Sequence, residues 1–312
     1  MGSIFTGAFM FAMVLQTAPL LLAGLGGLFG QRANVLNISL DGMMLAGAFV
    51  AITVGAATHS IIVGLLAAMV AGLVLALLFA WTVLWLKADP VVVGIGVGIL
   101  VSGLTTLLLS VLFNNEGSYI PTNFPSITKL NLGPLQHIPI IGPAFQGQTV
   151  LVLVAIALIP VASWLLYRTR YGLRVRAVGE EEAAAAAAGL NPRAVKLSAI
   201  LISGAMCGLA GAQLAVATLD QFLANMTAGR GFIVIAAIFV GRAKPWATAG
   251  ACLVFGAASA LATQLQLQGV SADLMLMLPY VVTVLLLIVR PLWRKVIERR
   301  QAPPAAAPAA TA

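Results

Sequence analysis

The chain has 312 residues, of which 61% are hydrophobic and only 8% are charged. A soluble domain carries about 25% charged residues, so this composition excludes a protein whose whole surface faces water and predicts one that lies mostly in lipid. The formal net charge is +8, but the basic residues lie in short loops between apolar runs, which is the pattern of the positive-inside rule and not of a nucleic-acid-binding surface.

A helix needs about 20 apolar residues to cross a bilayer. Runs of about this length cover residues 7–30, 35–57, 60–86, 91–113, 149–167, 195–219, 245–268 and 274–292. A further run, 231–241, is too short to cross alone. The sequence therefore predicts an all-α, polytopic transmembrane helical bundle of about eight to ten spans, some short or broken, within residues 1–292. The Pro/Ala-rich residues 293–312 predict a disordered tail.

The Lys and Arg residues predict the orientation. If segment 168–193 is cytoplasmic and the spans alternate, Arg32, Lys87, Arg242, Lys244 and the basic residues of 290–300 share its side, and only Lys129 and Arg230 fall outside. We therefore predict about nine crossings of a plasma membrane, with the N-terminus and loop 114–148 outside and the C-terminus in the cytoplasm. A re-entrant 220–241 would change this count.

Two polar breaks precede apolar runs, one at 37–42 and the other at 220–231. In the predicted orientation the helices after the two breaks run in opposite directions. This is typical of an inverted-topology repeat, in which discontinuous helices mark a substrate path near the membrane midplane. The candidate pathway residues are Asn37, Asp41, Gly42, Asp220, Asn225, Arg230 and Gly231. Asp41 can equally be a pathway group or a structural hydrogen-bond acceptor between helices.

Few patterns in the chain predict chemistry. Neither a Gly-x-x-x-x-Gly-Lys-Ser/Thr phosphate loop nor a His-Glu-x-x-His zinc motif is present. Cys207 and Cys252 lie within apolar runs, where we expect them to pack as small hydrophobic residues. Glycines four residues apart, such as Gly204 and Gly208, predict close helix packing. We expect no enzyme activity, cofactor or metal in this chain, and its scarcity of buried acids and histidines disfavours an ion-coupled carrier.

Segment 168–193 is a dense polar stretch between apolar runs. Three glutamates, Glu180, Glu181 and Glu182, precede an alanine run that ends at Gly189. Acidic residues favour a helix N-terminus, alanine favours helix, and Gly189 and Pro192 are stop signals. We predict a short helix over 180–188 whose flat alanine surface lets another protein approach. The alternative is an ordinary membrane-proximal helix.

Several motifs resemble one family. They are Arg168-Thr-Arg-Tyr-Gly-Leu-Arg-Val-Arg-Ala-Val-Gly-Glu180, Ala187-Ala-Gly-Leu-Asn191 and Asn37-Ile-Ser-Leu-Asp-Gly-Met-Met-Leu45. Together with similar stretches across about residues 15–290, they resemble the ABC-importer permeases of the branched-chain amino acid, ribose and simple-sugar superfamily, and most closely the nucleoside and simple-sugar branch. Ser39 and Asp41 depart from the Gly and Glu of the family pattern.

The resemblance implies a permease subunit that imports a nucleoside or simple sugar. It implies separate cytoplasmic ATPase subunits that bind ATP and Mg, a second permease, homologous or identical, and an extracytoplasmic substrate-binding protein. It assigns ATPase coupling to Arg168, Arg170, Gly172, Arg174, Arg176, Gly179, Glu180, Glu181, Glu182, Ala187 and Gly189. The alternatives are a permease for branched-chain amino acids or another small solute, an ion-coupled carrier, and a membrane scaffold. Neither of the last two accounts for the charged segment.

Overall fold

The computed structural model describes residues 7–115, 117–121, 124, 145, 147–267 and 277–285. Within them, seven helices are long and apolar enough to cross a membrane: α1 (Gly7–Arg32), α2 (Leu40–Thr58), α3 (Ile61–Leu84), α4 (Pro90–Phe113), α6 (Val150–Arg168), α9 (Pro192–Leu214, extended by the π-helical η2, Ala215–Leu219) and α11 (Pro245–Leu267). Shorter helices are α7 (Arg170–Glu180), α8 (Glu182–Ala187), α10 (Arg230–Val240) and residues 277–285. The predicted polytopic helical bundle is confirmed.

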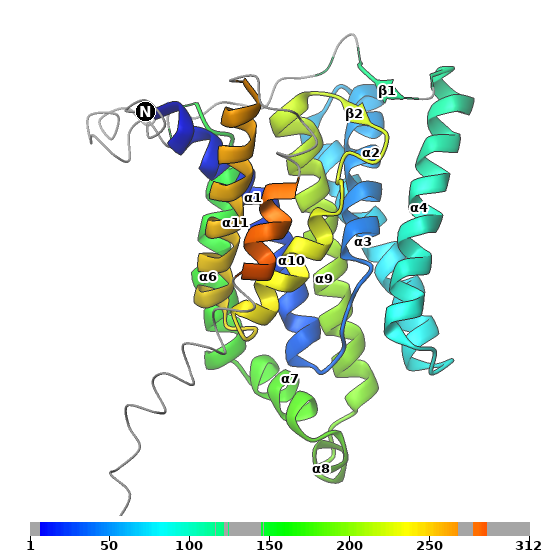
Figure 1. Ribbon diagram of the computed structural model, residues 1–312. Helices are drawn as coiled ribbons and strands as arrows, with labels where there is room; N and C mark the ends of the chain where they lie inside the picture. Colours follow the sequence, from blue (N-terminus) through cyan, green and yellow to red (C-terminus); the bar gives the residue numbers. More distant parts are fainter. Residues whose placement is uncertain are drawn as a thin grey trace, which may run out of the picture.

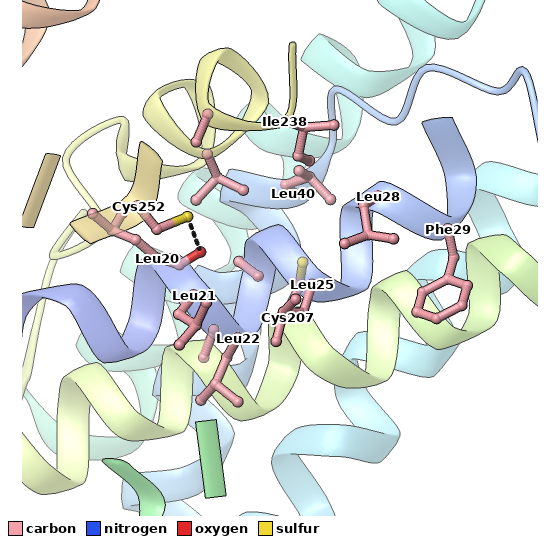
Figure 2. Close-up of a cluster of buried hydrophobic side chains, with 14 of the residues drawn as sticks. Leu20, Leu21, Leu22, Leu25, Leu28, Phe29, Leu40, Cys207, Ile238 and Cys252 are labelled. Atoms are coloured by element: carbon pink, nitrogen blue, oxygen red, sulfur yellow. Dashed lines mark hydrogen bonds between the residues drawn. The ribbon is translucent and has the colours of Figure 1, made fainter. Parts of the chain in front are cut away.

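The centre of the bundle is α1, which packs against α9 on one side and α11 on another. Its leucines Leu22 and Leu28 are fully buried. Figure 2 shows Cys207 of α9 and Cys252 of α11 among these leucines, where the Cys252 thiol donates to the carbonyl oxygen of Leu20 at 3.4 Å. Both cysteines are buried free thiols, which confirms their predicted packing role.

Helices α3 and α9 approach each other through small residues. A methyl group on Gly204 would meet the Ala76 side chain and the Gly72 carbonyl, and one on Gly208 would meet the Ala68 carbonyl. Small residues allow this backbone approach in lipid, where van der Waals packing drives helix association. The packing role predicted for Gly204 and Gly208 is thus seen directly.

The outer faces of α3 and α4 are apolar and exposed. Ile62 on α3 is 71% exposed, and Val92 and Ile99 on α4 are 71% and 70% exposed. Large apolar surfaces of this extent are rare on soluble monomers but are the expected contact with lipid tails. These faces therefore fit a multi-pass membrane protein.

Two helices, α2 and α10, begin part-way through the bundle (Figure 1). Helices α7 and α8 lie at one end of the molecule, which is called the α8 end below. The two-residue strands β1 (Ser118–Tyr119) and β2 (Phe222–Leu223) pair antiparallel at the opposite end, which is called the β end. Residues 33–39 enter from the α8 end before α2 starts, and residues 220–229 enter from the β end before α10 starts. Both predicted breaks are therefore interruptions of the helical structure within the bundle.

The segment 220–240 crosses the bundle completely. The chain that follows α10 meets the end of α1, where the Arg32 guanidinium donates to the carbonyl oxygens of Ala243 at 2.7 Å and Arg242 at 3.1 Å. Since Arg32 ends α1 at the α8 end, α10 does not return to the side from which its segment entered. Helices α2 and α3 run in the opposite directions to α10 and α11 (Figure 1), as the inverted-repeat hypothesis expects.

Two features differ from the prediction. Arg230, which the charge count placed outside the membrane although it was also a candidate pathway residue, lies in the first turn of α10 inside the bundle, because the preceding loop descends from the β end. The β1–β2 pair adds a small ladder that an all-α prediction does not include. Most of loop 114–148, most of the predicted span 274–292 and the tail 293–312 lie outside the described residues.

Candidate functional site

The N-termini of α2 and α10 meet at Asp41. Its carboxylate accepts a hydrogen bond from the amide of Gly231 at 2.9 Å and another from the Thr227 hydroxyl at 3.1 Å. The N-cap position of α10 is Gly229, which has no side chain to accept a hydrogen bond; the Arg230 and Phe232 amides donate to local backbone carbonyls, and the Gly231 amide donates to Asp41. Asp41 supplies from α2 the acceptor that an N-cap side chain supplies within its own helix.

The two helix ends are also in direct backbone contact. A Cβ atom on Gly231 would collide with the Asp41 backbone nitrogen and lie 2.5 Å from its Cα atom. Only glycine permits α10 to approach α2 this closely. The positive ends of both helix dipoles thus converge on the Asp41 carboxylate, which acts as a hydrogen-bond acceptor between the two helices.

Asn37 organises the extended segment before α2. Its side-chain oxygen accepts from the Ser39 amide at 3.1 Å and the Ser39 hydroxyl at 2.6 Å, and its side-chain nitrogen donates to the Ser203 hydroxyl on α9 at 3.2 Å. Asn37, Ser39 and Ser203 are all buried. These contacts hold non-helical backbone inside the membrane region, where each polar group needs a partner.

The first turn of α10 contributes to two pockets. One, of about 190 Å³, lies towards α2 and α4; among its lining residues are Asp41, Gly42, Ser102, Asn225 and Phe232. The other, of about 100 Å³, lies towards α1 and α11 and is here named the polar pocket; its side-chain-bearing polar residues are Gln16, Arg230, Ser259, Thr263, Gln266 and Tyr280. Of the predicted pathway residues, Asp41, Gly42 and Asn225 therefore line the pocket on one side of this helix end, and Arg230 lines the pocket on the other.

Arg230 reaches into the polar pocket from α10. Its guanidinium lies 3.4 Å from the Met226 carbonyl oxygen and 3.4 Å from the Gln16 side-chain oxygen on α1. Asp220, by contrast, is exposed, follows η2 in a left-handed conformation with φ 50° and stands apart from this group. The structure thus brings Asp41, Arg230 and Gly231 together and does not bring Asp220 to them.

The polar residues of α11 were not among the candidate residues predicted from the sequence. Ser259, Thr263 and Gln266 are spaced i, i+4 and i+7, which places them on one face of a helix. This periodicity within an apolar run is the signal that could have found them. Gln16 on α1 carries no such pattern, and its place in the pocket depends on how α1 packs.

Segment 168–193 forms two helices where one was predicted. Glu180 ends α7 and Glu182 begins α8, while Glu181 between them is extended, with φ −150° and ψ 102°. The predicted short helix that ends before Gly189 is confirmed as α8, but it begins at Glu182, so the prediction that Glu180, Glu181 and Glu182 all lie in its first turn is wrong. Gly189 follows α8 with φ 82°, as predicted for a helix stop, and the Leu190 amide donates to the Ala185 carbonyl at 3.1 Å. Pro192 begins α9 after the cap Asn191.

Helix α7 is docked firmly on the bundle. Gly172, Val175 and Val178 are its buried residues. Gly179 lies so close to the Arg32 carbonyl that a Cβ atom there would collide with it. The Arg176 guanidinium carbon lies 5.3 Å from the centre of the Tyr167 ring, within the range of a cation–π interaction. These contacts make α7 an extension of the α1 and α6 ends.

Tyr171 joins α7 to the start of α9. Its hydroxyl and the Ser198 hydroxyl are 3.1 Å apart. Burial raises the pKa of the Tyr171 phenol, and the hydrogen bond to Ser198 opposes that shift. The phenol is therefore neutral near pH 7 and can donate or accept at this junction.

Along segment 168–193, the outward surface first carries charged side chains and then a flat run of alanines. The exposed residues include Arg168, Arg170, Arg174, Glu180, Glu181, Glu182, Ala183, Ala184, Ala186, Ala187, Ala188 and Gly189. Glu182 has a structural partner, since its carboxylate accepts from the Lys196 ammonium at 2.6 Å and ties α8 to α9. The predicted coupling residues thus divide: Gly172, Arg176 and Gly179 hold α7 on the bundle, and the others face outward.

The comparisons with known proteins agree over nearly the whole chain. A family model described as "Branched-chain amino acid transport system / permease component" matches residues 9–288. The guanosine ABC transporter permease protein NupQ of Bacillus subtilis is 33% identical over 290 residues, 88% of this chain and 89% of that protein. The putative glucose ABC transporter permease protein TsgC13 of Haloferax volcanii is 34% identical (86% and 80%), and the nucleoside ABC transporter permease protein NupC of Lactococcus lactis subsp. cremoris is 32% identical (88% and 89%).

No solved structure showed a significant match. The family model and the relatives nevertheless cover more than four fifths of the chain at about one third identity. The family model, the relatives and the apolar helices together indicate a multi-pass plasma-membrane transport subunit, not an enzyme. The chain belongs to the family of branched-chain amino acid transport system permease components and is an ABC transporter permease.

Proposed function

We propose that this chain is the permease subunit of an ABC importer for a nucleoside or a simple sugar. The observation that carries the proposal is the similarity, over most of both chains, to permeases named for guanosine, nucleosides and glucose. The neutral polar side chains around the start of α10 support it, because hydroxyl-rich solutes are recognised by amides and hydroxyls.

In this proposal the α8 end faces the cytoplasm and docks on separate ATPase subunits, which bind ATP and Mg. The exposed alanines of α8 offer a flat surface to a partner, and the docking of α7 on Arg32 and Tyr167 provides a rigid connection from that surface to α1 and α6. A second permease, homologous or identical, completes the membrane unit, and a substrate-binding protein delivers solute at the β end. The basic residues at the α8 end support this orientation.

Uptake by membrane vesicles that contain the assembled transporter tests the substrate class. We expect ATP-dependent uptake of labelled guanosine, ribose or glucose, with competition by related solutes, and none of leucine. Uptake of leucine alone would instead select the amino-acid alternative. Uptake that survives ATP depletion and collapses with an uncoupler would contradict an ATP-driven importer.

A bulky substitution on α8 tests the docking surface. Ala187→Trp should lower co-purification with the ATPase subunits by about tenfold, which corresponds to about 1.4 kcal/mol of binding. The matched control is Ala57→Trp, at an exposed helical alanine of α2 at the β end. Equal co-purification and uptake in the two variants, with both folded by size-exclusion chromatography, would rule out α8 as the ATPase contact.

A further inference from the structure

We propose that the polar pocket between α1, α10 and α11 is a transit site that binds the hydroxylated edge of a neutral solute. The inference rests on the proposed function, because it assigns one place on the import path to that substrate class. It concerns Gln16, Arg230, Ser259, Thr263 and Gln266, of which only Arg230 stood out in the sequence.

The pocket is a polar surface on helices that are otherwise apolar. Ser259, Thr263 and Gln266 span about 10 Å along one face of α11 at 1.5 Å per residue. Thr263 and Gln266 are exposed in the single chain. Amide and guanidinium groups facing hydrocarbon are costly, while the exposed faces of α3 and α4 are covered with leucine, isoleucine and valine. The polar pocket therefore faces water or a polar solute.

The side chains match hydroxyl groups in their chemistry. Arg230 carries only donors, whereas the amides of Gln16 and Gln266 and the hydroxyls of Ser259 and Thr263 can both donate and accept. The residues that line the pocket, within the described part of the chain, include no Asp or Glu. Among these described lining residues the ammonium group of an amino acid would find no counter-charge, so a neutral polyol fits the pocket better than a zwitterion.

The contacts that Arg230 makes in the pocket are long ones. Both, to Met226 and to Gln16, measure 3.4 Å, beyond the usual 2.7–3.2 Å range for N–H···O bonds. A solute hydroxyl could exchange with them at little cost. The volume of about 100 Å³ is below the roughly 300–1,000 Å³ of pockets that enclose a drug-sized ligand, so the pocket would contact one edge of a sugar or nucleoside and would not enclose it.

Such a partial, weak site suits transit. A solute must bind well enough to enter a path and weakly enough to leave it. In the proposed importer, the tight and selective binding belongs to the extracytoplasmic binding protein. The polar pocket then supplies hydrogen bonds in place of water while the solute passes the start of α10.

The position of Arg230 is set by Asp41, which lies outside the pocket, and by Tyr280, which lines it. Asp41 holds the adjacent Gly231 amide from α2. The Tyr280 hydroxyl donates to the Ala228 carbonyl at 2.7 Å, and Gly229 with φ 76° could not bear a side chain, since a Cβ atom would lie 2.6 Å from that hydroxyl. Asp41 and Tyr280 are therefore positioning residues for the floor of the pocket.

Cysteine accessibility tests this inference. Thr263→Cys and Thr106→Cys are a matched pair, since each threonine is exposed and donates to the carbonyl four residues earlier, at 3.0 Å and 2.9 Å. Cys207 and Cys252 are buried and give little background. In the assembled transporter, we expect a charged, membrane-impermeant thiol reagent to label Thr263→Cys at least about tenfold faster than Thr106→Cys, and guanosine, ribose or glucose, whichever is transported, to slow that labelling.

Two results would overturn the inference. One is a Thr263→Cys thiol that reacts as slowly as the Thr106→Cys thiol, which would mean that lipid or protein covers the pocket. Cross-linking of Thr263→Cys between two permease copies would likewise show that protein covers it. The other is labelling that no transported solute slows. Slowing by leucine but not by guanosine, ribose or glucose would overturn the assigned ligand class.

A transport measurement separates this inference from the proposed function. Thr263→Val and Arg230→Gln should each lower uptake of the transported nucleoside or sugar by about fivefold or more at fixed solute, and Thr106→Val should not. If the unmodified transporter imports no nucleoside or sugar, the proposed function fails. If it imports one and both pocket variants match Thr106→Val, with normal folding, only the polar pocket fails.

Discussion

The carboxylate of Asp41 accepts the amide hydrogen of Gly231 at 2.9 Å across 190 residues of sequence. This bond joins the first turn of α2 to the first turn of α10, the two helices that begin inside the bundle. It makes Asp41 a hydrogen-bond acceptor between helices, one of the two roles considered for it from sequence. Because the neighbouring Arg230 lines the polar pocket, the same bond also fixes one wall of a proposed solute path.

Asp41→Ala should loosen the start of α10. Loss of an N-cap acceptor costs about 1 kcal/mol, and the Thr227 hydroxyl also loses its partner. Asp41→Asn should keep most of this stability, since the amide oxygen still accepts from Gly231 and the Thr227 hydroxyl can accept from the amide nitrogen. Thermal unfolding in detergent compares the two variants. An Asp41→Asn variant as unstable as Asp41→Ala would show that the negative charge of the carboxylate stabilises the start of α10, and not its hydrogen bond to the Gly231 amide.

Gly231→Ala should reduce stability and uptake more than the addition of a single methyl group would suggest. The added methyl group would overlap the Asp41 backbone, so α10 must move away and the cap bond must lengthen. We expect a clear loss of uptake and a lower unfolding temperature. Gly103→Ala on α4 is the control, because nothing lies within 4 Å of its new methyl group. Similar behaviour of the two variants would contradict the close packing of α2 and α10.

Asn37→Leu should destabilise the bundle. The substitution removes the acceptor of the buried Ser39 amide and hydroxyl and the donor to Ser203. A buried polar group left without a partner costs about 1–3 kcal/mol. Asn115→Leu is the comparison, since the Asn115 side-chain oxygen also accepts two hydrogen bonds, here from the backbone amides of Gly117 and Ser118, but at an exposed site. Stability measured by denaturant titration should fall much more for Asn37→Leu, and an equal fall would argue against its buried role.

Glu182→Gln should have only a small effect on stability. The carboxylate lies 2.6 Å from the Lys196 ammonium, but its side chain is 54% exposed, and exposed ion pairs contribute about 0–1 kcal/mol. The difference from the unmodified chain should shrink further as salt is raised. A large loss of uptake with unchanged stability would assign Glu182 to partner contact instead of to the α8–α9 junction.

The long apolar helices were predictable because a membrane span needs a run of about 20 apolar residues. The start of the 180–188 helix was not predicted correctly, because the helix begins at Glu182. Glutamate and alanine propensities favour a continuous helix there, but docking of Val175, Val178 and Gly179 against the bundle ends α7 at Glu180. Arg230 was misplaced for a related reason: the charge rule reads it as a loop residue, whereas the loop before it descends into the bundle.

Composition and charge by themselves determined that this chain is a polytopic membrane protein with one dense polar segment between its spans, because hydropathy and Lys/Arg placement act locally along the chain. The motifs carried the family resemblance. Only the tertiary structure decided that α10 completes a crossing, that Asp41 caps it from α2, and that Gln16, Arg230 and the α11 hydroxyls share a pocket. These arrangements depend on which helix faces meet. Polar groups buried within the membrane need hydrogen-bond partners, and here those partners lie far away in the sequence.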